Sequence, residues 1–376
     1  MRRVIPRRRA DSATMIALLI SLLIASTSPA QALAVPEQFI KLAASSTLAN
    51  PGILLVDPTN QSPLFSHEPD IQRAPASVMK LFSMATTLSV FTPETVFKTT
   101  LSATNKSDTY LLNGSVDPWL TTDLSEEEQN NRAFSPSLFN SILETHPEIK
   151  SITLEYKDVY ALDIQALQRY FAGYLNITPV KVNNLNDATE ELASVQSPPL
   201  SKIVEFTLLY SDNALADRLA RTAARAMGFA ADGAGLQQAF SKTLTDLGIS
   251  PQGIQIYDGN GLSHQNRVSA RQIVELLLAV RENPKFAPIV EGLPTSGKTG
   301  TLIHRFIYDA PNAVGLVHAK TGWINNTISL AGFVTVGSNQ YVFAIVANHI
   351  RNLESARQAA RVTIDQMLGT IAKPQK

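Results

Sequence analysis

The sequence of 376 residues contains no cysteine, which excludes disulfide bonds, thiolate metal sites and a cysteine nucleophile. Its basic and acidic side chains balance to a formal net charge of zero, so no basic surface points to nucleic acid. The six histidines are scattered, without an HExxH pattern or a close pair of carboxylates. We therefore expect neither a metal nor another cofactor.

Long hydrophobic runs are also scarce, and the one that stands out lies near the start. Arginines precede the apolar residues 15–25, "MIALLISLLIA", and the small-residue stretch "PAQALA" follows. A bilayer span takes about 20 apolar residues, so this run is short for a span and typical of an export signal. We predict a signal peptide over residues 1–34, cleaved after Ala32 or Ala34, and a soluble protein outside the cytoplasm. An uncleaved anchor and peripheral association with the membrane surface stay open.

The rest of the chain shows strand patterns near both ends and helical patterns between them. Short apolar runs predict strands at 53–57, 64–67, 97–116, 152–156, 314–318, 327–336 and 341–348. Helical spacing of apolar residues predicts helices at 77–91, 199–227, 236–247, 270–281 and 353–368. This order predicts an α+β fold, with an antiparallel sheet whose first and last strands come from opposite ends of the chain and helices packed on it.

A change in composition along the chain indicates its domain organisation. After the strands that begin near residue 97, the sequence is polar and varied as far as residue 194, without an obvious reactive cluster. We predict that residues 97–194 form an inserted, smaller mixed domain. Residues 35–96 and 195–376 would then make up the main domain.

Lys-Thr-Gly occurs twice, and its first copy completes a Walker A pattern from Gly292 to Thr299. A phosphate-binding loop should follow a buried strand and open a helix. Here Pro294 interrupts the loop, and "TLIHRFIYDAPN" after it is not a convincing helix. An exported protein would also meet little ATP, so we expect no nucleotide. The second copy begins at Lys320 and leads into a long β-rich run, which can form the wall of a cleft.

The stretch "PASVMKLF" places Ser77 three residues before Lys80. Positions i and i+3 lie on one face of a helix, so the hydroxyl and the amine can meet. A serine is a poor nucleophile until a base takes its proton, and lysine is such a base only when its pKa falls. The first turn of a helix also offers free N–H groups to a developing oxyanion. Alone the pattern is weak, since a helix start with a surface lysine looks the same.

Two further motifs make the pattern specific. Ser211 and Asn213 belong to a Ser-Asp-Asn at a helix start, which by itself reads as an N-cap. Lys320 and Thr321 can bind a carboxylate, and Gly322 lets a substrate backbone approach, although a β-turn looks similar. S-x-x-K, S-D-N and K-T-G in this order are the signature of penicillin-binding proteins and class A β-lactamases.

Over residues 51–348 the chain resembles the D-alanyl-D-alanine carboxypeptidases/endopeptidases of the class C low-molecular-mass penicillin-binding proteins. The phrases that carry this resemblance are "APASVMKLF", "FTPETVFKTTL", "LLNGSVDPWLT", "SPPLSKIVEFTLLYSDNALAD", "DGNGLSHQNRVS" and "LPTSGKTGTLIHRF". It implies a β-lactamase/transpeptidase-like fold and an exported serine DD-peptidase of a bacterial periplasm or cell envelope. Its partners would be peptidoglycan peptides, with β-lactam antibiotics as inhibitors.

The resemblance also implies roles for the motif residues. Ser77 would attack the peptide carbonyl while Lys80 takes its proton. Ser211, helped by the charge of Lys320, would pass a proton to the leaving amine. Asn213 would bond a substrate amide and the amine of Lys80.

The remaining expected site residues would bind substrate. Thr321 would hold the terminal carboxylate beside Lys320, and Gly322 would let the substrate backbone come close. Trp323 stands where a small hydroxyl residue is common in the family, so its backbone N–H would complete the oxyanion site while the pocket shape changes. Arg305 either lines the cleft or braces a loop.

Two further expectations concern a loop and the size of the inserted region. Asp258, Asn260 and Ser263 are predicted to form a loop and to cap the helix that follows. The segment between Ser77 and Ser211 is shorter than in large members of the family, so the extra domains are reduced.

Other functions remain open at this point. A β-lactamase needs a second base, and no Glu-x-x-x-Asn loop lies between Asn213 and Lys320. A penicillin or peptidoglycan sensor should carry a signalling domain or anchor, and a plain esterase would not need Lys320. The balance of carboxypeptidase and endopeptidase activity and the oligomeric state are not specified by the sequence.

Overall fold

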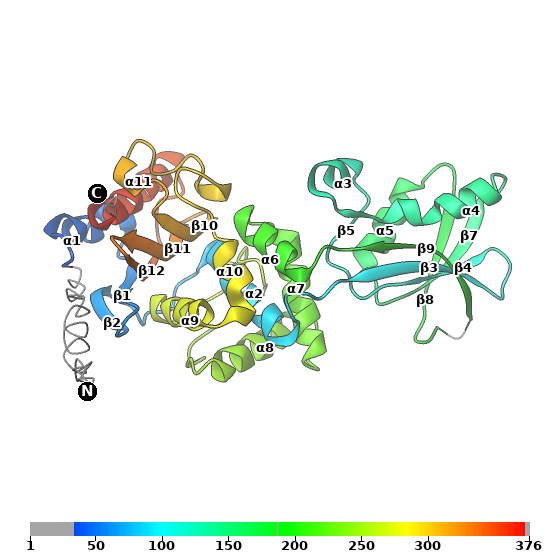
Figure 1. Cartoon of the computed structure of the whole chain (residues 1–376), viewed down its shortest axis with the longest axis horizontal. Coiled ribbons are helices and arrows are strands. Elements are labelled where there is room, and N and C mark those ends of the chain that lie inside the picture. Colours follow the sequence, from blue (N-terminus) through cyan, green and yellow to red (C-terminus); the bar gives the residue numbers. More distant parts are fainter. Residues whose placement is uncertain (1–33, 186, 373–376) are drawn as a thin grey trace, which may run out of the picture. The chain divides into compact units, whose positions relative to one another are not determined.

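Strands from the two ends of the chain pair in one sheet (Figure 1). The computed structural model describes residues 34–185 and 187–372. Within them, β1 (Gly52–Asp57) runs antiparallel to β12 (Asn339–Ala347) along its length. The prediction of a sheet shared by both ends of the chain is therefore confirmed.

The predicted leader, residues 1–34, lies outside the described residues apart from Ala34. None of the helices in the described ranges combines the length and the apolar character that crossing a bilayer requires.

This sheet has five strands in the order β10-β11-β12-β1-β2, with every neighbouring pair antiparallel. Its other strands are β2 (Ser62–His67), β10 (Val317–Ile324) and β11 (Thr327–Val336). The strand predicted at 314–318 starts later and runs further, so Lys-Thr-Gly lies within β10 and not in a turn. The reason is pairing across the sheet, since Lys320 lies opposite Ala331.

Helices surround this sheet, and most of them match the predicted positions. The α-helices associated with it are α1 (Glu37–Ala43), α2 (Met79–Val90), α6 (Leu200–Leu209), α7 (Asn213–Ala226), α8 (Gly233–Asp246), α9 (Ala270–Glu282), α10 (Ala287–Glu291) and α11 (Glu354–Ile371). Short 3-10 turns are η1 (Ser46–Leu48), η2 (Ala76–Val78), η4 (Pro284–Phe286), η5 (Gly300–Leu302) and η6 (Pro311–Ala313). The helix predicted at 199–227 is two helices, because Ser211 between them adopts a left-handed φ of 61°.

Helix α2 occupies the centre of the main hydrophobic core. Every residue from Met79 to Leu88 is buried, and a helix that is buried all round packs inside a domain rather than on its surface. The nucleophile candidate Ser77 immediately precedes this helix, so it stands on one of the least movable elements of the fold.

A second five-stranded sheet forms from residues 98–196, in the order β8-β7-β4-β3-β9. Its strands are β3 (Lys98–Thr104), β4 (Thr109–Asn113), β7 (Ser151–Lys157), β8 (Asn176–Lys181) and β9 (Ala188–Gln196), and the same segment carries β5 (Leu120–Thr121), α3 (Leu124–Asn130), β6 (Ala133–Phe134), η3 (Ser135–Phe139), α4 (Asn140–Thr145) and α5 (Ala161–Tyr170). The sheet is mixed, because β7 lies parallel to β4 and β8 while β3 pairs antiparallel with both of its neighbours. A separate hydrophobic cluster covers it. The assignment of 97–194 to an inserted domain stays a prediction.

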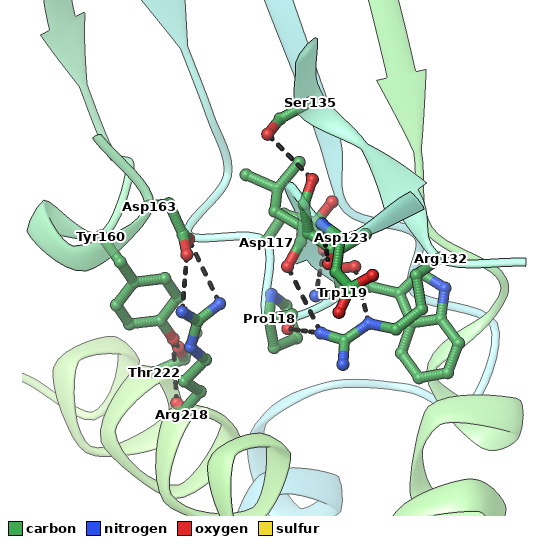
Figure 2. A network of polar contacts seen from close by, with 12 residues as sticks. Asp117, Pro118, Trp119, Asp123, Arg132, Ser135, Tyr160, Asp163, Arg218 and Thr222 are labelled. Atoms are coloured by element: carbon green, nitrogen blue, oxygen red, sulfur yellow. Dashed lines mark hydrogen bonds and ion pairs between the residues drawn. The ribbon is translucent and has the colours of Figure 1, made fainter. Parts of the chain in front are cut away.

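A polar network joins this mixed-sheet segment to α7 (Figure 2). Arg218 of α7 donates to both carboxylate oxygens of Asp163 in α5, at 2.6 and 3.2 Å. The hydroxyl of Tyr160 donates to the carbonyl of Arg218 at 3.0 Å and lies 2.6 Å from the hydroxyl of Thr222. The contacts hold α7, which begins at Asn213, against the mixed-sheet segment.

Asp117 lies beside this network with only part of its bonding capacity used. The backbone N–H of Trp119 donates to its Oδ1 at 2.8 Å, whereas Oδ2 has no hydrogen-bond partner within the described ranges. Burial is the main cause that raises the pKa of Asp117 to about 7, and the charges of Arg132 and Arg218 oppose the rise. The folded protein therefore keeps a proton on this carboxyl group at mildly acidic pH.

Replacing Asp117 with asparagine should change stability in a pH-dependent way. Between about pH 4 and 7 the folded chain holds a proton that the unfolded chain releases, so native stability falls as pH rises. Asp117→Asn removes that loss, and we expect its Tm to match the unchanged chain near pH 4 and to exceed it at pH 8. One pKa unit corresponds to about 1.4 kcal/mol, so the gain has a ceiling of about 4 kcal/mol.

Asp163→Asn is the matched control, because it breaks the bonds to Arg218 in the same network. It should lower the Tm at pH 8, since removing one partner of a buried ion pair typically costs about 3–5 kcal/mol. A Tm difference for Asp117→Asn that is the same at both pH values would contradict the assignment of a titrating Asp117.

Candidate active site

Ser77 and Lys80 meet where the sequence spacing predicts. Ser77 lies on η2, which leads directly into α2, and Lys80 lies in the first turn of α2. The Nζ of Lys80 is 3.0 Å from the Oγ of Ser77. The hydroxyl and the amine are therefore within the distance that direct proton transfer requires.

Lys80 is held away from water by acceptors from three segments. Besides Ser77, its amine donates to Oδ1 of Asn213 at 2.7 Å and to the carbonyl oxygen of Asn260 at 2.8 Å. The side chain is fully buried, and burial lowers its pKa to about 8, against the opposing charges of Asp212 and Asp258. Three acceptors match the three donors of an ammonium group, and a pKa near 8 leaves a useful fraction neutral at neutral pH.

Lys320 is the second buried amine of the site. It lies in β10 with none of its side chain exposed, and its Nζ donates to the carbonyl of Thr321 at 3.1 Å. Burial lowers its pKa well below the usual value, and the charge of Lys80 lowers it further. Burial and the neighbouring Lys80 thus both disfavour the charged form of Lys320.

Two of the strained backbone positions belong to the site. Ala76 has a φ of 50° and Ser211 a φ of 61°, both in the left-handed region that non-glycine residues rarely adopt. Gly261 has a φ of 86°, and a Cβ at this position would lie 1.9 Å from the carbonyl oxygen of Ala76. The loop around Gly261 can pack against η2 only because that residue is glycine. Strain of this kind is typical of functional sites.

Asp258 organises the loop that reaches Lys80. Its carboxylate accepts from the backbone N–H of Gly261 at 2.7 Å and of Ser263 at 2.6 Å. The loop-forming prediction for these residues is confirmed, but the predicted capping role is wrong, because Ser269 caps α9. Sequence reasoning missed the contribution of Asn260, which acts through a backbone carbonyl that any residue would carry.

Gly322 allows β10 to approach η2. A Cβ at this position would lie 2.0 Å from the Oγ of Ser329 and 2.7 Å from the carbonyl oxygen of Pro75. The same Ser329 hydroxyl donates to Pro75 at 2.6 Å, so β11 is also fixed to the turn that carries the nucleophile candidate. The close approach of β10 to the turn that carries Ser77 therefore requires a residue without a side chain at position 322.

A cleft of about 620 Å³ opens above the two buried lysines. The predicted site residues that line it are Ser77, Ser211, Asn213, Arg305, Thr321, Gly322 and Trp323. β10 is an edge strand of its sheet. The outer side of its first half bonds to residues 294–296, whereas Thr321, Gly322 and Trp323 of its second half line the cleft. The structure thus brings together all nine predicted residues, seven along the cleft and two beneath it.

Arg305 both lines the cleft and braces a loop. Its guanidinium pairs with Asp365 of α11 at 2.5 Å, and Asp365 is itself almost fully buried. The charge of Arg305 is therefore largely matched within the protein before any substrate arrives.

Sequence reasoning missed several other residues of the cleft. Thr301 places its Oγ1 2.8 Å from the Oγ1 of Thr321, so the two hydroxyls lie side by side. From α11, the cleft receives Gln358, Arg361 and Asp365, which share one helix face at i, i+3 and i+7. That spacing can be seen in the sequence, but polar residues along one face of a terminal helix ordinarily predict a solvent-exposed surface.

The first Lys-Thr-Gly forms no phosphate-binding loop. It follows helix α10 rather than a strand and is succeeded by the three-residue turn η5. The amine of Lys298 lies against Gly315 and does not line the cleft.

Known proteins share sequence similarity with the segments that form this site. The sequence matches the D-Ala-D-Ala carboxypeptidase 3 (S13) family over residues 38–131 and 143–371. The chain belongs to this family. Among curated relatives, carboxypeptidase DacB of Mycolicibacterium smegmatis is 34% identical over 185 residues, which cover 48% of this chain and 39% of the relative. The chain matches only 30% to 41% of the length of the first three such relatives.

Solved structures share the fold. Penicillin-binding protein 4 from Haemophilus influenzae superposes with a TM-score of 0.72 at 18% identity, covering 89% of this chain and 99% of that one. A predatory endopeptidase from Bdellovibrio bacteriovorus, acylated by penicillin G, gives a TM-score of 0.62 at 15% identity, covering 86% and 93%. The predicted fold class, an α+β fold of the β-lactamase/transpeptidase-like kind with an antiparallel sheet flanked by helices, is thereby confirmed, and a smaller mixed sheet accompanies it.

Adding one methyl group at Gly322 should impair the site of this S13 chain. Gly322→Ala would force β10 away from η2, and a displacement of about 1 Å at a reacting centre can cost about 100-fold in rate. We expect labelling by a fluorescent penicillin to slow by about that factor. Gly233→Ala is the control, because its Cβ would meet no atom closer than 3.4 Å. Equal labelling rates for both variants would show that β10 needs no close approach.

Proposed function

We propose that this S13 chain is an exported serine DD-peptidase that cleaves the terminal D-Ala-D-Ala bond of peptidoglycan stem peptides, D-Ala-containing cross-links, or both. The observation that carries the proposal is the buried amine of Lys80, 3.0 Å from the hydroxyl of Ser77 and 2.7 Å from Asn213, at the floor of the cleft. The family match and the shared fold support the same chemistry.

In the proposed acylation, the Oγ of Ser77 attacks the carbonyl carbon of the penultimate D-Ala. Neutral Lys80 takes the hydroxyl proton, which it is suited to do because burial lowers its pKa to about 8. The backbone N–H groups of Ser77 and Trp323 hold the oxyanion. Each such donor typically lowers the barrier by about 3–4 kcal/mol.

The leaving group departs on the side of β10. Lys320 and Thr321 bind its carboxylate, with the hydroxyl of Thr301 placed to join them at 2.8 Å from that of Thr321. The C–N bond breaks as the serine ester forms, and Ser211 passes the proton to the departing amine. Water then attacks the ester, restoring the hydroxyl of Ser77 and releasing the shortened peptide. A β-lactam would form the same ester and leave far more slowly.

Location and domain organisation belong to the same proposal. Peptidoglycan substrates lie outside the cytoplasmic membrane, which agrees with the export signal predicted for residues 1–34. We also propose that residues 97–194 act as an inserted domain, since they supply their own sheet and hydrophobic cluster.

Mass spectrometry after treatment with penicillin tests the acyl-enzyme directly. We expect one covalent adduct per chain on Ser77, with none on Ser77→Ala. Ser89→Ala serves as the control, because Ser89 lies on helix α2, which directly follows the turn that carries Ser77, and it should keep the adduct. An adduct elsewhere, or one that survives in Ser77→Ala, would refute the assignment of the nucleophile.

Digestion of purified peptidoglycan then separates the activities. Release of free D-alanine identifies a carboxypeptidase, and conversion of dimers to monomers identifies an endopeptidase. An adduct without either product would identify a penicillin receptor, and rapid turnover of nitrocefin would identify a β-lactamase. Either of these last two outcomes would overturn the proposed peptidase.

A further inference from the structure

The cleft continues well beyond the residues that the proposed chemistry requires. Thr301 and Thr321 mark the place proposed for the carboxylate of the leaving group. Past them, the lining includes His304, Arg305, Gln358 and Arg361, from the segment after η5 and from α11. Since these residues lie beyond the carboxylate position, they border the leaving-group side of the scissile bond.

Direct contacts hold the part of α11 that lines the cleft against the segment after Thr301. Arg305, four residues after Thr301, pairs with Asp365 of α11 at 2.5 Å. The same guanidinium donates to the backbone carbonyl of Arg361 at 3.4 Å. One face of α11 is thereby held beside the segment that carries Thr301.

Trp323 also borders this extension. It lies two residues after Thr321, on the same face of β10, roughly 7 Å along the strand. Its ring is 53% exposed, which is unusual for so large an apolar side chain bordering a cleft. The guanidinium groups of Arg361 and Arg357 lie 5.2 and 5.4 Å from the ring centroid.

The two arginines differ in what they can offer a ligand. Arg357 bonds through all three of its nitrogens to Glu354, Asn352 and Asn325, and it does not line the cleft. Arg361 lines the cleft and bonds only through Nη1, to Glu354 and Gln358. Among the described residues, its Nε and Nη2 have no partner.

Within the described ranges, one positive charge stays unmatched next to Trp323, because Arg361 and Arg357 share the single carboxylate of Glu354. Arg305 and Asp365 neutralise each other within the protein. Asp309 also borders the cleft, but it lines a second hollow with Gly369, and eight residues of helix place that end of α11 about 12 Å from Arg361. Of the two cations on the exposed ring, Arg361 is the one that lines the cleft.

We infer that Trp323 and Arg361 form a leaving-group subsite that selects cross-linked peptides with an acidic acceptor strand over a terminal D-alanine. The inference rests on the proposed peptidase function and extends it to a substrate class. A leaving D-alanine ends at its methyl and carboxylate groups and does not span the roughly 7 Å to the ring. The longer side chain of a cross-linking residue crosses that gap, packs on Trp323 and brings acceptor carboxylates to Arg361.

The test compares two substrates in three chains. The substrates are a stem pentapeptide, which releases D-alanine, and a cross-linked dimer with free acceptor carboxylates. In Arg361→Gln the ratio of kcat/KM for dimer over pentapeptide should fall about tenfold, mainly through KM, because a charge-assisted bond is lost. Arg357→Gln removes the other guanidinium on the same ring, and its ratio should stay within about twofold of the unchanged chain. Equal ratios in all three chains, or equal losses in both variants, would overturn the subsite.

Recognition of the acceptor carboxylates can also be tested on the unchanged chain, without any variant. Amidating the acceptor carboxylates of the dimer, except the one beside the scissile bond that Lys320 and Thr321 bind, should lower its kcat/KM about tenfold, and no effect of this amidation would overturn the inference. A chain that releases D-alanine and leaves dimers intact would overturn the subsite alone. A chain that cleaves neither substrate and forms no adduct on Ser77 would overturn the proposed function itself.

Discussion

The arrangement of this site depends on one amine that has lost its water. Lys80 receives acceptors from η2, from the start of α7 and from the loop at 258–266, which are far apart in the sequence. Removing a charged group from water costs a large free energy, so the three hydrogen bonds and the charges of Asp212 and Asp258 offset only part of it. The remainder appears as a lowered pKa, which is what turns a lysine into a base.

The fold supplies the rigidity that this arrangement needs. Helix α2 is buried all round, and Gly261 and Gly322 let a loop and an edge strand reach the turn before it. The strained φ values of Ala76 and Ser211 persist because these surrounding contacts fix them. The ion pair of Arg218 with Asp163 ties α7, and with it Asn213, to the mixed-sheet segment (Figure 2).

Most features that depend on local sequence pattern were predicted correctly. Several features that depend on contacts between segments far apart in the sequence were not. The pairing of β1 with β12, the helix after Ser77 and the nucleophile–base spacing followed from periodicity and motif order. The strand predicted at 314–318 stopped short of Lys-Thr-Gly, because only pairing with β11 extends β10 through it. The carbonyl of Asn260 was missed since a backbone atom leaves no sequence signal. The α11 wall was missed because Gln358 and Arg361 look like surface residues until the helix is placed.

NMR can measure directly whether the amine of Lys80 is neutral or charged at a given pH. Titration of the chain with isotope-labelled lysine amines, assigned through the signal that Lys80→Arg removes, would report the pKa of Lys80 itself. The account predicts a titration near pH 8. A Lys80 that titrates near the ordinary value of 10.5 would contradict it, because such an amine would stay charged and could not take the proton of Ser77.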